Sequence, residues 1–394
     1  MNASAGQATE ALATAAAEPT TAPAGGMIDV VVPAIPGGLD TPCLVVDLDT
    51  VERNAQRLAS ELATRGVALR PHVKTHKSVR LARLQLDHGA AGITVGNLGE
   101  AEVMADAGID DVFVAYPLWA DGPKASRLRA LNERVRRLAV GVDSAAAAER
   151  LAAAVRGTSR PLPVLLEIDS GNRRSGVAPD RALEVAGAAE RLGLRVEGVF
   201  THGGHSYRGR DAVTDAAHDE IRTLAAAAGA LRDAGIDASV VSAGSTPTAV
   251  LAAAHGVTEI RAGTYILGDR QQAFLGAAPP DGLALWVVAT VVSTAVPGQV
   301  VLDAGAKILT KDRADFLAGF GWLPAYPEAA IERLNDYHGI VRIPPGSPSP
   351  TLGETVAILP NHVCPVVDLV DRFLAIRDGS AEGWWPVDAR GRNG

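Results

Sequence analysis

The stretch RPHVKTHK, residues 70–77, starts the pattern that decides the fold. It overlaps the end of a short apolar run, Ala68 to Val73. A helical pattern rich in Ala, Leu and Arg begins directly after it. The same succession recurs along the chain, which is typical of βα units around a parallel sheet. Eight strands are expected: Ala68–Val73, Gly92–Asn97, Asp111–Tyr116, Leu138–Val142, Val164–Asp169, Val196–His202, Val240–Gly244 and Glu259–Gly263.

Helical patterns separate these strands, with Ala and Leu at helical spacing. They include Ser78–Asp87, Gly99–Ala107, Ser144–Val155, Pro179–Leu192 and Asp211–Ala234. A strand Cys43–Leu48 and a helix Asp49–Thr64 precede them. The eight pairs predict an α/β protein with a (β/α)8 TIM-like barrel over residues 49–280 rather than an open doubly wound sheet. The sequence contains neither a GxGxxG nor a Walker loop.

The segments on either side of the barrel have different patterns. Residues 281–394 alternate Val, Ile and Leu runs with Gly/Pro turns, which predicts a smaller C-terminal β domain. Its expected strands are Ala284–Thr294, Gln299–Asp303, Thr355–Leu359 and Phe373–Arg377. We expect the strand segment 27–48 to pair with this domain. Residues 1–26 lack Lys and Arg, so they are expected to form a disordered tail rather than a signal peptide.

Composition narrows the class of partner. The chain has 394 residues, 47% of them hydrophobic, and a net charge of -8 without a basic stripe, so we expect no nucleic-acid or membrane partner and a small-molecule substrate. No run of about 18 apolar residues occurs that could form a transmembrane helix. The two cysteines cannot form a disulfide framework, which favours a reducing, cytoplasmic location.

Lys74 is the first candidate for chemistry, because it lies where the first barrel strand should end. Only five of the 37 basic residues are Lys, and the rest are Arg. Lysine can lose its proton and attack a carbonyl to form a Schiff base, whereas arginine stays protonated. The alternative is a solvated lysine at a strand end.

Other polar residues are expected on the same rim of the barrel. Gly244, Ser245 and Thr246 open the helix after strand seven, where an anion such as phosphate would be stabilised, although Ser245 or Thr246 could merely cap that helix. A reactive lysine and a phosphate site together suggest pyridoxal 5'-phosphate (PLP). Arg174 would suit its pyridine nitrogen, unless it is a surface residue. His202 and Tyr207, after strand six, could contact cofactor or substrate.

A candidate metal site lies in the β domain. His362 and Cys364 are two residues apart, which would put both side chains on one side of an extended strand. Imidazole and thiolate suit a borderline-soft cation such as Zn²⁺. A buried cysteine and a capping histidine are the alternative. His338 is a further residue that could point at this site.

Taken together, these motifs resemble the fold-type III PLP enzymes, within them the D-threonine aldolase and D-serine dehydratase family with its alanine-racemase-like barrel. The matches are Thr41-Pro42 with LVVD, RPHVKTHK, Asp169-x-Gly171 with Arg174-x-Gly176-Val177, SAGSTPT, RAGTYILGD, LDAGAKILTKD, YHG and PNHVCP. The resemblance implies D-3-hydroxy amino acid substrates, a homodimer, and a role for each matching site residue. These roles are the PLP lysine for Lys74, the pyridine-nitrogen partner for Arg174, the phosphate neighbourhood for Gly244, Ser245, Thr246, Gly263 and Tyr265, and metal ligands for His362 and Cys364.

The resemblance leaves the reaction open between dehydration and aldol cleavage. Dehydratase-like members use His-x-Cys with zinc, whereas aldolase-like members often carry His-x-Asp, which suits Mn²⁺. Cys364 therefore favours a D-serine/D-threonine dehydratase, with D-threonine aldolase as the alternative. An amino-acid racemase and a non-catalytic PLP-binding protein are further alternatives. Tyr337 and Thr201 depart from the family pattern and leave the substrate contacts undetermined.

Overall fold

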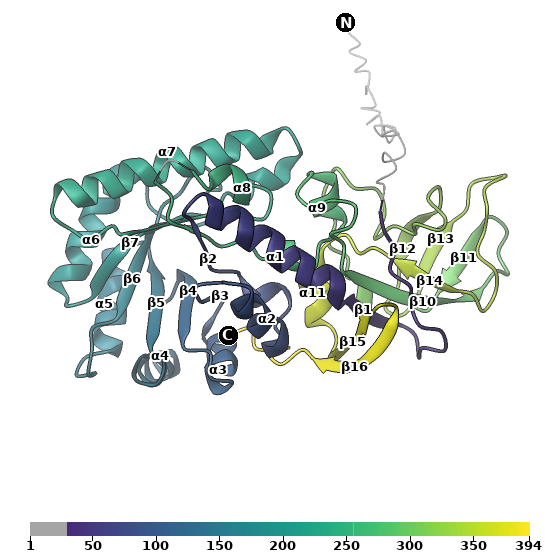
Figure 1. The fold of residues 1–394 in the computed structure, drawn as a ribbon, viewed down its shortest axis with the longest axis horizontal. Helices are drawn as coiled ribbons and strands as arrows, with labels where there is room; N and C mark the ends of the chain where they lie inside the picture. The colour runs from purple at the N-terminus through teal and green to yellow at the C-terminus, as the bar shows by residue number, and fades with distance from the viewer. Residues whose placement is uncertain (1–29, 255) are drawn as a thin grey trace, which may run out of the picture.

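The structure, a computed structural model, describes residues 30–254 and 256–394, and the predicted tail at 1–26 lies outside them. Two bodies lie side by side, a barrel of strands and helices and a domain made mostly of strands (Figure 1). Helix α1 (Leu48–Thr64) runs from the β domain along the barrel, so the two bodies share one continuous element.

The barrel is an eight-stranded, all-parallel sheet with helices between its strands, which confirms the predicted fold class. Its strand order is β2-β9-β8-β7-β6-β5-β4-β3. The ring closes where His72, just after β2, forms a parallel bridge with Thr94 of β3. The strands are β2 (Ala68–Leu69), β3 (Ile93–Val95), β4 (Asp111–Pro117), β5 (Arg137–Val142), β6 (Pro163–Glu167), β7 (Arg195–Phe200), β8 (Val240–Ala243) and β9 (Glu259–Ile260).

Some of the barrel helices begin at a capping side chain or at a proline. Asn97 and Ser144 each accept a hydrogen bond from the backbone N–H three residues on, and Pro123 opens α4. The barrel helices after α1 are α2 (Val79–Asp87), α3 (Leu98–Asp106), α4 (Pro123–Arg134), α5 (Ala145–Ala154), α6 (Ala182–Arg191), α7 (Ala212–Asp233), α8 (Ala249–Ala252) and α9 (Arg270–Phe274), with short 3₁₀ turns η1 (Val73–Thr75), η2 (Pro179–Arg181), η3 (Gly204–Arg208) and η4 (Thr264–Ile266).

Aromatic rings fill the inside of the barrel below the rim. Phe113 of β4 and Phe200 of β7 pack edge to face, with ring centroids 5.1 Å apart. Gly141 of β5 lies against them, and a Cβ at that position would lie 2.8 Å from Phe200 Cζ. The barrel is therefore a packed core that supports the rim from beneath.

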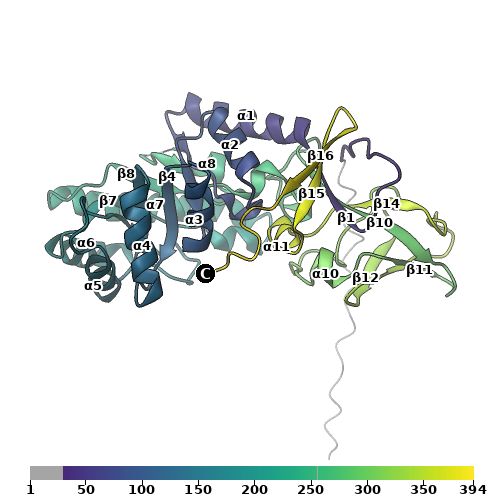
Figure 2. The same ribbon diagram turned by 90° about the horizontal axis from the view of Figure 1, so that it is seen from below.

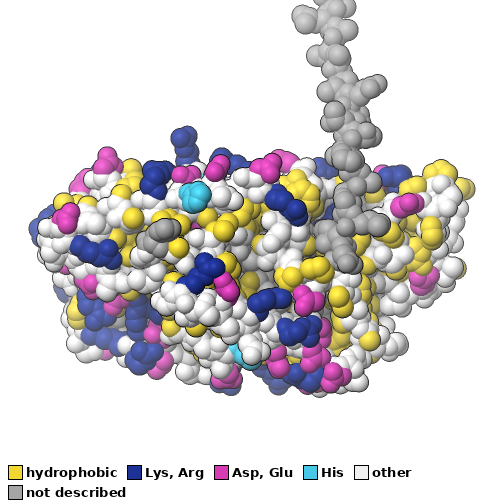
Figure 3. Space-filling model, turned by 45° about the horizontal axis from the view of Figure 1, so that its top comes forward, with side chains coloured by type: hydrophobic (Ala, Val, Ile, Leu, Met, Phe, Trp, Pro, Cys, Tyr) yellow, Lys and Arg dark blue, Asp and Glu magenta, His cyan; other side chains and the backbone are white. Residues whose placement is uncertain are grey.

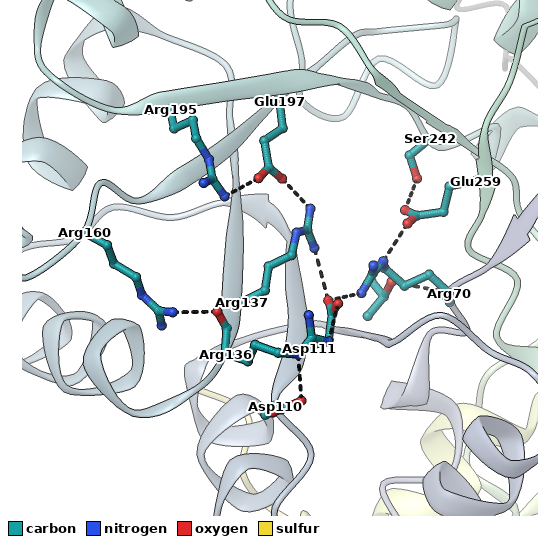
Figure 4. Close-up of polar contacts among 11 residues, drawn as sticks. Arg70, Asp110, Asp111, Arg136, Arg137, Arg160, Arg195, Glu197, Ser242 and Glu259 are labelled. Atoms are coloured by element: carbon teal, nitrogen blue, oxygen red, sulfur yellow. Dashed lines mark hydrogen bonds and ion pairs between the residues drawn. The ribbon is translucent and has the colours of Figure 1, made fainter.

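The opposite end of the barrel is tied together by ion pairs between strands (Figure 4). Arg70 lies 2.6 Å from both Asp111 and Glu259, and all three are buried. Arg137 joins Asp111 to Glu197, so the network connects β2, β4, β5, β7 and β9. Buried charges are retained only when paired, and here every member has an opposite charge beside it.

The β domain is built on a second eight-stranded sheet of order β12-β13-β11-β10-β1-β15-β16, with β14 also paired to β10. Strand β1, from before the barrel, pairs antiparallel with β10 and parallel with β15. The strands are β1 (Cys43–Asp47), β10 (Leu285–Ser293), β11 (Gln299–Leu302), β12 (Ala330–Leu334), β13 (Gly339–Arg342), β14 (Thr355–Ile358), β15 (Arg372–Arg377) and β16 (Ser380–Pro386).

Two short helices interrupt this domain, α10 (Ala306–Leu309) and α11 (Val363–Asp368). The second shows that the expectation of an extended strand at His362–Cys364 was wrong, since Cys364 lies in the first turn of α11. The physical reason is a long-range cap: the buried carboxylate of Asp269 accepts the N–H of Val363 at 3.1 Å.

The last residues of the chain return to the barrel beside α2 and α3 (Figures 1 and 2). The Ala389 N–H donates to the Lys77 carbonyl, and Lys77 Nζ lies 2.7 Å from Asp368 and 2.5 Å from the Asn393 side-chain oxygen. Lys77 is itself buried, with a positive φ of 50°. The segment that carries Lys74 is therefore braced by the C-terminal residues.

Basic and acidic side chains are intermixed on the face drawn in Figure 3. None of the helices in the described parts of the chain is long and apolar enough to cross a membrane.

Candidate active site

A cavity of about 830 Å³ lies at the rim of the barrel, where the carboxyl ends of the strands meet the segments around Asp312 and His362. Parallel strands bring their carboxyl ends to the same edge, so residues far apart in the sequence converge there. The predicted site residues on its wall are Lys74, Arg174, His202, Tyr207, Gly244, Ser245, Thr246, Gly263, His362 and Cys364. The remaining one, Tyr265, is not part of the wall.

Lys74 lies in the tight turn η1, directly after β2. Gly263, at the end of the neighbouring β9 segment, packs against this turn: a Cβ there would lie 2.8 Å from Thr75 Oγ1 and 2.9 Å from the His72 carbonyl oxygen. The Gly263 position thus has to be glycine for the lysine turn to lie where it does.

Backbone N–H groups without acceptors lie on the wall next to hydroxyl groups. Within residues 30–254 and 256–394, the N–H groups of Thr246, Gly263 and Thr264 have no hydrogen-bond acceptor. The hydroxyls of Ser245, Thr246 and Thr264 lie beside them, with Thr264 Oγ1 2.9 Å from Thr246 Oγ1. Several free donors converging on one region fit the oxygens of a phosphate group.

The structure differs from the expectations for this region in three ways. Helix α8 begins only at Ala249 and has four residues, so no helix opens at Gly244 and a helix dipole contributes little. The Gly244 N–H is not free, because it donates to the buried carboxylate of Glu220 at 3.0 Å. The Tyr265 side chain turns away from the cavity, and its hydroxyl accepts a hydrogen bond from Gln85 at 2.9 Å.

Two arginines reach the cavity from different depths. Arg174, after β6, is half exposed and lies 3.6 Å from the buried carboxylate of Glu167. Arg261 is buried; it donates to Ser242 Oγ at 2.6 Å and to the Thr201 carbonyl, and it lies over the Phe200 ring. The half-exposed Arg174 side chain has room to move toward a bound molecule, while the buried Arg261 side chain is fixed at the bottom of the cavity by its hydrogen bonds.

Two histidines on the wall are held neutral. Burial lowers the pKa of His202 well below its usual value, and the positive charges of Lys74 and Arg174 lower it further. Burial and the charge of Lys74 also lower the pKa of His72 well below its usual value. Both imidazoles are therefore uncharged at neutral pH, and each keeps one ring nitrogen that can accept a hydrogen bond.

His362 and Cys364 lie together on the opposite side of the cavity, and Asp312 joins them. Asp312 Oδ2 lies 2.5 Å from His362 Nδ1, so Nε2 is the ring nitrogen that is not paired with Asp312. Burial opposes a charged thiolate at Cys364, but the neighbouring His362 outweighs it and lowers the pKa of the thiol. The Cys364 thiol also donates to Thr75 Oγ1 at 3.4 Å, next to Lys74.

The donor set fits a bound metal with open positions. In the parts of the chain that the structure describes, no three or more His, Cys, Asp and Glu side chains come together as a complete set of metal ligands. His362 and Cys364 would therefore supply two protein ligands and leave the other positions to water and substrate. A carboxylate on the second ring nitrogen is the usual support of a metal-binding histidine, and Asp312 is placed for it.

The structure also places residues that the sequence argument did not use. Arg261, Thr264 and Asp312 lie within the quoted motifs RAGTYILGD and LDAGAKILTKD, so the signal was present, but their side chains could not be directed from sequence alone. Thr201 is turned away and donates to the Ile168 carbonyl. His338 is exposed in the turn between β12 and β13 and is not on the cavity wall.

Comparison with known proteins shows which family shares this architecture. A family model described as "Alanine racemase, N-terminal domain" matches residues 46–271, more than half of the chain, and one described as "Putative serine dehydratase domain" matches residues 284–376. The chain belongs to the alanine racemase N-terminal domain family. The resemblance stated from the sequence is thereby confirmed.

Relatives that the chain matches over most of their length include dehydratases and aldolases. The chain is 37% identical to a D-threo-3-hydroxyaspartate dehydratase from a Delftia species, over 88% of this chain and 97% of the relative. The crystal structure of a D-threonine aldolase from Filomicrobium marinum has a TM-score of 0.82 at 33% identity and covers 90% of this chain and 96% of its own. A D-threo-3-hydroxyaspartate dehydratase with cysteine replaced by alanine, described as metal-free, has a TM-score of 0.80 at 36% identity, covering 88% and 97%. These relatives are dehydratases and aldolases, and the chain is a member of this family of PLP-dependent lyases.

Proposed function

We propose that the protein is a PLP- and divalent-metal-dependent dehydratase of D-3-hydroxy amino acids such as D-serine and D-threonine. The observation that carries this proposal is that Lys74 and the His362–Cys364 pair lie on the wall of one cavity. The first is the residue type that forms a Schiff base with PLP, and the second pair binds transition metals. A cavity of about 830 Å³ has room for the cofactor and a small amino acid.

The residues of the wall fit PLP in three places. Lys74 is assigned to the carbonyl carbon of the cofactor, and Arg174 to its pyridine nitrogen. The free N–H groups and hydroxyls around Thr246 and Thr264 are assigned to its phosphate. Gly244 is assigned to shaping the turn before Ser245, through its hydrogen bond to Glu220. His202 and Tyr207 are assigned to the surroundings of the pyridine ring. Tyr265 is assigned to holding Thr246, because its backbone N–H donates to the Thr246 hydroxyl oxygen.

The metal is assigned to His362 Nε2 and Cys364 Sγ, with Zn²⁺ favoured over Mn²⁺ because a thiolate is a soft ligand. Both cysteines are free, which fits a reducing compartment such as the cytoplasm. The homodimer implied by the sequence resemblance is kept as part of this proposal.

When bound, PLP withdraws electrons from Cα and the metal withdraws charge from the β-hydroxyl oxygen. Lys74 is the residue placed to take the Cα proton, because it is the only lysine on the wall in the described parts of the chain. Breaking the Cα–H and Cβ–O bonds removes water, and hydrolysis of the resulting enamine gives the 2-oxo acid and ammonia.

Aldol cleavage is the second candidate, since a D-threonine aldolase structure resembles the chain as closely as a dehydratase does. It breaks the Cα–Cβ bond and needs a base for the β-hydroxyl proton instead of the Cα proton. His202, held neutral by burial and by the charges around it, could take that proton.

Product identity tests the proposal. The purified protein, supplied with PLP and Zn²⁺, is incubated with D-serine, D-threonine and D-threo-3-hydroxyaspartate. We expect ammonia with pyruvate, 2-oxobutyrate or oxaloacetate, respectively. Glycine with an aldehyde would assign the chain to the aldolases instead, and racemised amino acid without either product would contradict both assignments.

Metal removal tests the role of His362 and Cys364. Treatment with a chelator should lower the activity at least about tenfold, and added Zn²⁺ should restore it, because substrate binding is assigned to the metal. The L-enantiomers serve as the substrate control. Activity that is indifferent to chelation would remove His362 and Cys364 from the active site.

A further inference from the structure

A buried carboxylate lies directly behind the proposed phosphate site. Glu220, in the middle of α7, is completely buried. Its Oε1 atom accepts two backbone N–H groups, from Gly203 at 2.8 Å and from Gly244 at 3.0 Å. Gly203 follows β7 and Gly244 follows β8, so one side chain joins the ends of two neighbouring strands.

These contacts begin where the strand pairing stops. The parallel ladder between β7 and β8 ends at Phe200 and Ser242, and the last backbone bond runs from Thr201 N–H to the Ser242 carbonyl at 3.0 Å. Beyond this point both chains leave the sheet to form the rim of the cavity. Glu220 therefore continues the connection between them by two residues.

The backbone at both positions suits the close approach of this carboxylate. A Cβ at Gly203 would lie 2.7 Å from Glu220 Cδ. Gly244 has a φ of +100°, which L side chains rarely adopt. The glycines of HGGH and SAGST thus leave room for Glu220 and for the turn that it holds.

Retaining a carboxylate here has a cost. The Oε2 atom has no hydrogen-bond partner among the residues that the structure describes, and burial raises the pKa of the side chain. A buried polar group without a partner is unfavourable, because it has lost its hydrogen bonds to water. Core packing alone would be better served by an apolar side chain, so the two N–H contacts are the property that requires Glu220.

We propose that Glu220 is a positioning residue for the cofactor phosphate. By taking the Gly244 N–H, it fixes the turn that leads to Ser245 and Thr246 on the cavity wall. This inference rests on the proposed PLP site. It predicts that the affinity for the phosphate group, rather than for the pyridine ring, depends on Glu220.

The test measures binding of PLP and of pyridoxal, which lacks the phosphate, to the cofactor-free protein by absorbance titration. E220A should raise the Kd of PLP about tenfold and leave the Kd of pyridoxal within about twofold. E220Q, which keeps an oxygen acceptor for both N–H groups, should bind PLP within about threefold of wild type. G203A should resemble E220A, because its Cβ displaces the carboxylate.

T223A, one turn further along the same buried face of α7, is the matched control and should bind both compounds like wild type. Unchanged PLP affinity in E220A, equal losses for PLP and pyridoxal, or an E220Q that behaves like E220A would each overturn the inference. Thermal melting of the cofactor-free variants verifies folding. A wild type that binds no PLP would instead end the proposed function, so the two failures are distinguishable.

Discussion

At the scale of single residues, the proposed metal site depends on the contact between Asp312 and His362, which joins two segments of the β domain. Asp312 holds His362 through Nδ1 and thereby directs Nε2 into the cavity. Supporting carboxylates of this kind typically contribute a factor of 10 to 100 in metal affinity.

We therefore expect D312N to weaken Zn²⁺ binding by about 10- to 100-fold, measured by competition with a chromogenic chelator. The spectrum of bound PLP should stay unchanged, because Asp312 supports the metal ligands and not Lys74. D315N changes an exposed carboxylate three residues away and serves as the control. Equal zinc affinity in D312N and wild type would show that His362 needs no such support.

Lys74 is the residue on which the cofactor assignment depends. K74R keeps the positive charge but removes the amine that can form a Schiff base, so the visible absorbance band of the PLP-loaded protein should be absent and activity should be lost. K311R makes the same change at an exposed position and should retain both. A K74R protein that keeps the band would place the cofactor on another residue.

The sequence was informative about these residues to different degrees. Lys74 and Thr246 could be predicted to lie near each other because both follow barrel strands, whereas Cys364 was a candidate only through its residue type and its spacing from His362. Arg261 and Glu220 were not found, because an arginine after β9 and a glutamate in the middle of α7 look ordinary in a sequence. Their roles arise from contacts across about 17 to 60 positions of the chain, which no local pattern encodes.

At the scale of elements, the eight strand and helix pairs could be predicted because their periodicity is local. Helix α11 could not, because its cap comes from Asp269, 94 positions away. The barrel strands β2 and β9 are shorter than expected, although backbone hydrogen bonds from Arg70 to Ile260 and from His72 to Ala262 continue beyond their ends.

The ion network of β2, β4 and β9 makes a testable contribution to the barrel. Removing one carboxylate leaves Arg70 partly unpaired, so D111N should lower the free energy of unfolding by about 3 kcal/mol at pH 7, measured by urea denaturation. D106N, which breaks a largely exposed pair with Arg134, should cost less than about 1 kcal/mol.

The difference in unfolding free energy between wild type and D111N depends on pH, and the pKa of Asp111 gives the direction of this dependence. Burial alone would raise the pKa of Asp111, but Arg70 and its neighbours lower it overall. The stability from the ionised group is thus present above the unfolded value of about 3.9 and is lost as the pH falls through the folded value. The gap between wild type and D111N should narrow below about pH 4. A gap that widens on acidification would contradict the pairing.

At the scale of the whole molecule, two segments from opposite ends of the chain hold the halves together. Strand β1 is placed between β10 and β15, and α1 carries the chain from there to the barrel. The C-terminal residues return to the segment of Lys74. The cavity between the halves therefore forms only when both are in place.

The position of β1 has a consequence during protein synthesis. The apolar strand CLVVD leaves the ribosome early, but its neighbours begin at Leu285 and Arg372. At 5 to 20 residues per second, β1 waits roughly 10 to 50 s before β10 is made. The barrel can assemble in this interval while both edges of β1 lack a partner. The nascent chain is thus exposed to chaperone binding or aggregation at this one strand until its last hundred residues appear.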